Sequence, residues 1–82
     1  SSVATVEKAD PSNDGHVAAP FAGVVNATVK AGDEVKAGDQ VAVIEAMKME
    51  ASISATKDGK VERVAIGQAT KVEGGDLIVV IN

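Results

Sequence analysis

Short apolar runs separated by turn-forming residues follow one another along most of this chain. The clearest runs are Val24–Val29, Gln40–Met47, Val61–Ile66 and Leu77–Ile81, and glycine, aspartate or lysine stand between them. Runs of this length, rich in valine and isoleucine and bounded by turn residues, are typical of β-strands. No stretch carries an apolar stripe of helical period longer than two turns. The pattern therefore predicts an all-β domain.

The two halves of the chain repeat each other. When the sequence is shifted by 37 positions, Val29–Ile44 lies over Ile66–Ile81 without a gap, and Gly38 and Asp39 meet Gly75 and Asp76. Two copies are too few for a solenoid, and about four short strands per half are too small a unit to be stable alone. We therefore expect two four-stranded antiparallel sheets, related by a pseudo-two-fold axis and packed as a flattened barrel.

The N-terminal stretch differs from the rest in composition. Residues 1–15 are polar and rich in turn formers, so we expect a flexible tether there and a folded domain over residues 16–82. Within the tether, residues 10, 12, 14 and 15 have the spacing of a calcium loop. The twelfth position is Phe21 rather than a bidentate Glu, and no helices flank the loop, so a solvated linker is favoured over a metal site.

The stretch Glu45–Glu50 stands near the midpoint, between two strand-like runs. Their short separation predicts a hairpin with Met47 and Lys48 at its tip. A tight turn of the commonest hairpin type favours Asn-Gly or Asp-Gly, because both central residues need positive φ. Met-Lys breaks that rule, and a local rule broken inside a consistent pattern indicates a functional site.

Composition excludes several classes of function. The formal net charge of −4 argues against a nucleic-acid partner, and one Phe without Trp or Tyr leaves no stacking platform for bases. No apolar run approaches a membrane span, so we expect no membrane partner. The absence of cysteine excludes disulfides and thiolate metal sites and is compatible with the cytoplasmic location that we expect.

The motif Ala46-Met47-Lys48-Met49 resembles the attachment motif of biotinyl carrier domains. The resemblance implies a barrel-sandwich hybrid, here without the thumb insertion of some bacterial carriers, and biotin held covalently on Lys48. It implies recognition of the tip by biotin protein ligase and by partner active sites. The recognition candidates are the neighbours of that lysine: Glu45, Ala46, Met47, Met49 and Glu50.

The resemblance extends over nearly the whole chain. His16-Val17-Ala18-Ala19-Pro20, Lys36-Ala37-Gly38-Asp39 and Lys71–Ile78 are most similar to the C-terminal biotinyl domain of pyruvate carboxylases. This implies a biotin carboxylase domain and a carboxyltransferase domain as partners, between which the carrier moves carboxyl groups. The chain alone is then not an enzyme and has no catalytic residue, although the parent protein would be a ligase.

Other interpretations stay open at this point. Another biotin enzyme, such as propionyl-CoA carboxylase, transcarboxylase or oxaloacetate decarboxylase, shares most of these motifs. A lipoyl carrier has the same fold, but it usually has Asp before the lysine and Ala after it, where this chain has Met47 and Met49. An interaction module of this fold would need no modified lysine. The single histidine, His16, has no second ligand or nucleophile motif and is expected to be structural or exposed.

Overall fold

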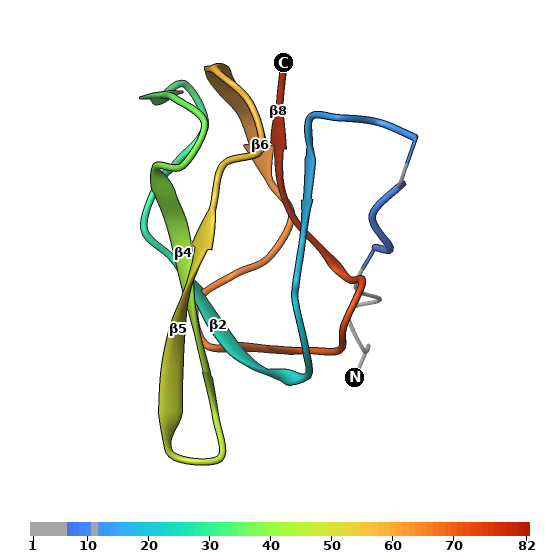
Figure 1. Ribbon diagram of the computed structural model, residues 1–82, viewed down its shortest axis with the longest axis vertical. Coiled ribbons are helices and arrows are strands. Elements are labelled where there is room, and N and C mark those ends of the chain that lie inside the picture. The colour runs from blue at the N-terminus through green and yellow to red at the C-terminus, as the bar shows by residue number, and fades with distance from the viewer. Residues whose placement is uncertain (1–6, 11) are drawn as a thin grey trace.

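The computed structural model describes residues 7–10 and 12–82 and contains eight strands (Figure 1). They are β1 (His16–Ala18), β2 (Gly23–Ala27), β3 (Glu34–Val35), β4 (Gln40–Ala46), β5 (Met49–Ser54), β6 (Gly59–Val64), β7 (Thr70–Val72) and β8 (Leu77–Ile81). In this part of the chain, no helix has the length and hydrophobicity needed to cross a membrane. The predicted all-β class is confirmed.

Two four-stranded antiparallel sheets form the molecule. Their strand orders are β5-β4-β2-β7 and β1-β8-β6-β3. Each strand of the first sheet has its counterpart at the same place in the second: β5 matches β1, β4 matches β8, β2 matches β6 and β7 matches β3. The predicted pseudo-two-fold of a barrel-sandwich hybrid is therefore confirmed, because the 37-residue repeat superimposes β4 on β8 and Val35 on Val72.

The core between the sheets is aliphatic. Each outer strand contributes one buried valine or isoleucine, whereas every residue of β8 is buried. Ile44, in the middle of β4, is fully buried, as are Val25 of β2 and Leu77 of β8. Burying such side chains contributes about 1.5–3 kcal/mol each to folding, so a core without large aromatic rings can still hold a small domain.

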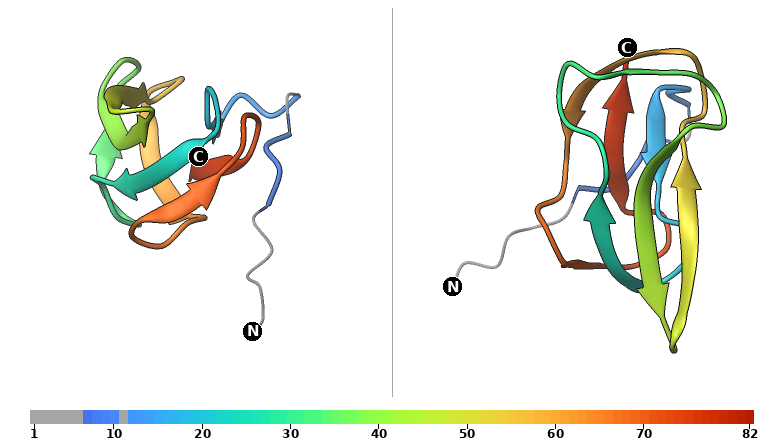
Figure 2. Two further views of the ribbon diagram at one scale, coloured as in Figure 1. Left: turned by 90° about the horizontal axis from the view of Figure 1, so that it is seen from below. Right: turned by 90° about the vertical axis from the view of Figure 1, so that its left-hand side faces the viewer.

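The β4–β5 hairpin extends beyond the rest of the sandwich. Its tip lies at one end of the long axis, and the C-terminus lies at the other (Figures 1 and 2). This separation follows from the repeat, because the β1–β8 pair that carries the C-terminus is the counterpart of the β5–β4 pair that carries the tip.

Residues at the start of the described chain are bound to the start of β8. The Leu77 N–H donates to the Glu7 carbonyl oxygen (2.7 Å), and the Ala9 N–H donates to the Gly75 carbonyl oxygen (2.9 Å). Lys8 forms an ion pair with Asp76, the one charged side chain that is buried among the described residues. The first six residues of the expected tether, and Pro11, lie outside the described residues, and the boundary at residue 16 stays a prediction.

Asp76 is stabilised in its charged form. Hydrogen bonds from the Lys8 ammonium and from the Glu73 N–H hold the pKa of this carboxyl below its ordinary value. The charged form therefore favours the folded state, and this contribution is lost only when the pH falls through that lowered pKa.

Candidate functional site at the hairpin tip

The tip of the β4–β5 hairpin is a two-residue turn. Strand β4 ends at Ala46 and β5 begins at Met49, and these two residues are paired across the hairpin. Met47 and Lys48, the only residues between them, have φ of 53° and 67°. Both central residues at positive φ are typical of a type I′ turn, whose twist matches that of the flanking strands. The predicted hairpin, with Lys48 in its turn, is thus present.

This backbone conformation is costly for Met and Lys. The left-handed region places Cβ too close to the following carbonyl oxygen, at a cost of roughly 1–2 kcal/mol per residue. Only Ala69, of the other non-glycine residues that the structure describes, also has a positive φ. Met47 and Lys48, the two central residues of the motif Ala46-Met47-Lys48-Met49, are therefore both strained.

The side chains of the tip point into solvent. Met47 is 91% exposed and Met49 is 71% exposed, so neither fills a gap in the core. Lys48 is exposed, and no described residue makes a hydrogen bond or ion pair with its ammonium group. A lysine amine held clear of the domain can be enclosed by another protein from all sides.

Two glutamates face each other directly below the tip. Glu45 of β4 and Glu50 of β5 are cross-strand partners, and both are exposed. Val24 of β2 is the partner of Glu45 on its other side and is in turn paired with Lys71. Like charges directly opposite destabilise a strand pair. The acidic pair is therefore a second feature of this hairpin that stability alone does not explain.

The base of the hairpin is anchored in the core. Val25, Ile44 and Ala51 are paired in one row across β2, β4 and β5, and the first two are fully buried. Gly23 allows β2 to approach β4 closely, because a Cβ at this position would lie 2.6 Å from the Glu45 carbonyl oxygen. A well-packed base and a projecting turn give the tip a fixed direction.

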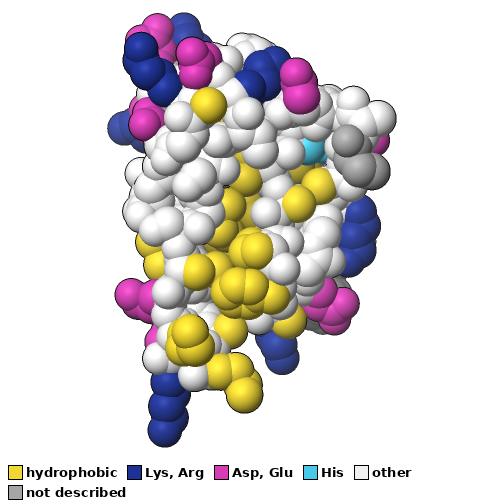
Figure 3. All heavy atoms as spheres, in the orientation of Figure 1, with side chains coloured by type: hydrophobic (Ala, Val, Ile, Leu, Met, Phe, Trp, Pro, Cys, Tyr) yellow, Lys and Arg dark blue, Asp and Glu magenta, His cyan; other side chains and the backbone are white. Residues whose placement is uncertain are grey.

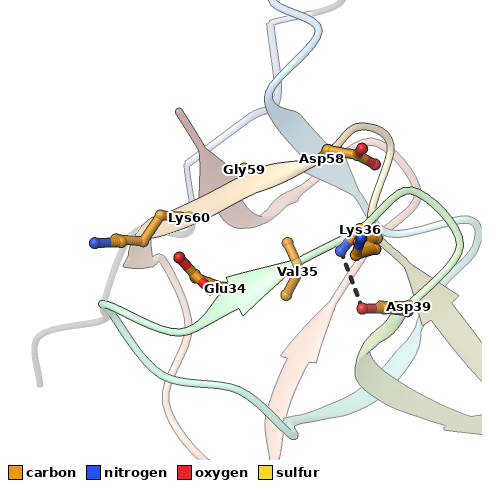
Figure 4. Close-up of a pocket in the computed structure, with 7 residues that line it drawn as sticks. All are labelled: Glu34, Val35, Lys36, Asp39, Asp58, Gly59 and Lys60. Atoms are coloured by element: carbon orange, nitrogen blue, oxygen red, sulfur yellow. Dashed lines mark hydrogen bonds between the residues drawn. The ribbon is translucent and has the colours of Figure 1, made fainter.

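A hollow at the opposite end of the molecule offers no comparable chemistry. It measures about 510 Å³ and is lined by Glu34, Val35, Lys36, Asp39, Asp58, Gly59 and Lys60 (Figure 4). Two of its carboxylates already act as acceptors for backbone N–H groups: Asp39 for Lys36 (3.0 Å) and Asp58 for Ala37 (2.8 Å). They stabilise turns, and their charges are mixed with those of lysines.

The remaining candidates from the sequence have local roles. The Nδ1 atom of His16 accepts a hydrogen bond from the Asp10 N–H (3.0 Å), which supports the structural role expected for this histidine. The Asp10 carboxylate accepts from the N–H and hydroxyl of Ser12. In the described residues, no group of three His, Cys, Asp or Glu side chains is placed to hold a metal ion.

The sequence indicated the two methionines of the tip as contact residues, but not the other apolar side chains that are exposed near them. Phe21 is 42% exposed and Val24 is 36% exposed, and together with Met47 and Met49 they are the large hydrophobic side chains that the described structure leaves exposed. Figure 3 shows hydrophobic side chains running from the tip up one face of the molecule. Phe21 stands in a turn between two strand-like runs, where no periodic pattern predicts whether a side chain is buried, so only the structure could have located it here.

The family model and the curated relatives agree on one family. The family model described as "Biotin-requiring enzyme" matches residues 13–81. Pyruvate carboxylase of Aspergillus terreus is 46% identical over 72 residues, which are 87% of this chain and 6% of that protein. Pyruvate carboxylase of Bacillus subtilis is 37% identical over 82 residues, 99% of this chain and 7% of that protein. The crystal structure of Kluyveromyces lactis urea carboxylase matches 100% of this chain and 7% of its own, with a TM-score of 0.76 and 35% identity.

Proposed function

This chain belongs to the family of biotin-requiring enzymes, and on that premise we propose that it is the biotin carboxyl carrier domain of a pyruvate carboxylase. Lys48 is the proposed attachment site of biotin. The observation that carries the proposal is the tip itself: a solvent-exposed lysine, flanked by two exposed methionines, on a strained two-residue turn that projects from the domain.

The residues present suit a covalently attached biotin. A primary amine that no described neighbour engages is free to attack the carbonyl carbon of an activated carboxyl group. In the proposed reaction, a biotin protein ligase presents biotin as its acyl-adenylate. The uncharged Lys48 nitrogen forms the new C–N bond, the C–O bond to AMP breaks, and the nitrogen loses a proton to give a neutral amide. When attached, biotin supplies a ureido nitrogen that can accept and release a carboxyl group.

The neighbours of Lys48 act in this proposal through recognition. The small side chain of Ala46 leaves room beside Lys48 for a partner protein. Met47 and Met49 offer flexible apolar contacts to a ligase or to a partner active site. Glu45 and Glu50 give the hairpin a negative charge that steers a basic partner surface toward it. The repulsion between Glu45 and Glu50 and the strain of the turn both lower the stability of the domain. Recognition by a partner protein would explain why both are present.

In this proposal, the domain carries the biotin arm between two active sites. A carrier tethered to its partners raises the effective concentration of its arm at two active sites without tight binding at either. The proposed partners are the biotin carboxylase and carboxyltransferase domains of a larger protein, since the chain spans only 6–7% of the pyruvate carboxylases it matches. The proposed tether comprises residues 1–15, and the carrier comprises residues 16–82.

The relatives favour pyruvate as the substrate of the parent protein. Pyruvate carboxylases match this chain from both fungi and bacteria, at 37–46% identity over most of its length. The alpha chain of propionyl-CoA carboxylase from Sus scrofa, 44% identical over 75 residues, makes that enzyme the second candidate.

The test of the carrier role is carboxyl transfer from bicarbonate. Protein loaded with biotin by a ligase is incubated with a separate biotin carboxylase, ATP and radiolabelled bicarbonate, beside the Lys48→Arg variant. We expect acid-labile label on the wild-type protein and none on the variant. Loaded protein that takes up no label from an active carboxylase would refute the carrier role. Modification by a lipoyl ligase but not by a biotin ligase would point to the lipoyl alternative.

A further inference from the structure

The exposed apolar side chains of this domain are gathered at the end that carries Lys48. Phe21 and Val24 belong to one segment, and Met47 and Met49 belong to the other. The two segments are joined by strand pairing, since Val24 is opposite Glu45 and a Cβ at Gly23 would lie 3.1 Å from that of Ala46. The loop between β1 and β2, which contains Phe21, lies at the same end of the molecule as the hairpin tip (Figures 1 and 2).

The exposure of Phe21 is the least expected feature of this surface. Phe21 is the only Phe, Trp or Tyr of the chain, yet it is 42% exposed instead of contributing to an otherwise aliphatic core. The loop that carries it is held by a hydrogen bond from the Gly75 N–H to the Ala19 carbonyl oxygen (2.9 Å). Gly74 lies beside its backbone at ordinary van der Waals distance, since an added Cβ there would be 3.5 Å from the Phe21 Cα. A half-exposed ring on a supported loop is a fixed apolar platform, whereas Met47 is a free side chain in solvent.

We propose that this platform, formed by Phe21 and Met49, is a docking site for the biotin ring system carried on Lys48. The inference rests on the proposed function, and it adds a resting position for the arm on the domain's own surface. The lysine stem and the valeryl chain of biotin together have enough rotatable bonds to fold back past Ala46 to the β1–β2 loop. One face of the bicycle is apolar and suits an aromatic ring and a thioether, while the ureido edge stays in water.

Biotin on its own arm is favoured over a protein partner for two reasons. A stable protein interface covers roughly 800 Å² on each partner, far more than four partly exposed side chains can supply. An arm attached two residues from Ala46 is present at an effective concentration in the millimolar range, so even a weak contact is populated. Resting on this platform would keep the arm from non-specific contacts between its visits to the two active sites.

Val24 provides the matched control. It is exposed to nearly the same extent as Phe21, but its strand partners Glu45 and Lys71 are exposed polar residues, which places its side chain on the outer face of the sheet. Val24→Ala therefore removes apolar surface without touching the proposed platform.

The experiment is nuclear Overhauser spectroscopy on isotope-labelled protein carrying unlabelled biotin, with loading verified by intact mass. Because the chain has one Phe and two Met residues, their ring and methyl signals are resolved without ambiguity. We expect contacts between the ring protons of Phe21 and those of biotin, and a shift of the Met49 methyl signal on loading. Both should persist in Val24→Ala and disappear in Phe21→Ala. Phe21→Leu, which retains an apolar side chain, should keep part of the Met49 shift and confirms that the loop is folded.

A second readout is the rate at which streptavidin captures the loaded protein. If half of the arms are docked at any moment, Phe21→Ala raises this rate about two-fold, and Val24→Ala leaves it unchanged. Fully loaded protein in which the Phe21 ring signals are the same as in the unloaded form would overturn the docking site and leave the carrier proposal intact. Failure of the ligase to load folded protein would remove the basis of both.

Discussion

Replacing the two residues of the hairpin turn with the pair that this turn prefers should stabilise the domain. The double substitution Met47→Asn, Lys48→Gly installs Asn-Gly, the strongest sequence signal for a type I′ turn. Both native residues have φ near +60°, a conformation that costs L-residues with a Cβ roughly 1–2 kcal/mol each. The native turn is therefore strained, and a substitution that removes the strain should raise the free energy of unfolding.

The expected gain is smaller than the sum of these costs. Gly at position 48 removes the penalty but loses about 0.5–1 kcal/mol through the greater freedom of the unfolded chain. Asn at position 47 relieves only part of its penalty. A net gain of about 1–2 kcal/mol remains, and for a domain of this size each kcal/mol raises Tm by about 4–8 °C. We therefore expect Tm to rise by about 4–16 °C.

Differential scanning calorimetry is the appropriate assay, because the chain has no Trp or Tyr to report unfolding by fluorescence. Lys71→Gly is the control: Lys71 is exposed, lies inside strand β7 and is not among the residues with positive φ. That substitution should lower stability by about 0.5–1 kcal/mol. A double variant with Tm at or below that of the wild type, beside a control that behaves as expected, would refute the claim that the turn is strained.

Three further predictions concern the stability of the fold. Ile44→Val, which removes one methylene from a fully buried side chain below the tip, should lower the free energy of unfolding in urea by about 0.5–1.5 kcal/mol. Asp76→Ala should cost about 1–3 kcal/mol at pH 7, whereas its exposed repeat counterpart Asp39→Ala should cost less than about 1 kcal/mol; equal losses would contradict the buried role. Because the pKa of Asp76 is lowered on folding, its contribution is complete above its unfolded pKa of about 3.9, so the difference between wild type and Asp76→Ala should shrink as the pH falls below that value. Glu50→Gln should raise stability by roughly 0.2–1 kcal/mol by removing the repulsion with Glu45, and a gain that persists unchanged in 1 M salt would argue against a charge effect.

The architecture was predictable because the sequence repeats itself. Overlaying the two halves without a gap brings Asp39 onto Asp76 and Ile44 onto Ile81, and the two sheets then follow strand for strand. The placement of the turn was predictable as well, since the short stretch Glu45–Glu50 stands between two strand-like runs, with Met47 and Lys48 at its centre. Local turn rules are broken at Met47 and Lys48, and such a break is expected where a functional constraint competes with stability.

The contacts of the N-terminal segment could not be predicted. Lys8 and its partner Asp76 are 68 positions apart, and a polar stretch gives no periodic signal of where it will lie. Glu7 is held in the same way by a bidentate ion pair with the Arg63 guanidinium, at 2.6 and 3.0 Å. Composition describes such a segment as a linker, whereas its backbone groups complete hydrogen bonds at the start of β8.

The exposure of Phe21 could not be predicted from the sequence either. Phe21 stands in a turn after Pro20, and a turn residue belongs to no periodic pattern that would predict whether its side chain is buried. The β1–β2 loop that carries it is bound to the turn before β8 by a hydrogen bond from the Gly75 N–H to the Ala19 carbonyl oxygen (2.9 Å), a tertiary contact that no local pattern contains.

The attachment of biotin to Lys48 is the central claim, and peptide mapping by mass spectrometry tests it most directly. The protein is co-expressed with a biotin ligase, and its intact mass is measured. It is then digested and its peptides are fragmented, so that each of its lysines is observed separately. The account predicts one added biotin less one water, located on Lys48, and no addition in Lys48→Arg. Biotin on any other lysine, or folded protein that an active ligase leaves unmodified, would contradict it.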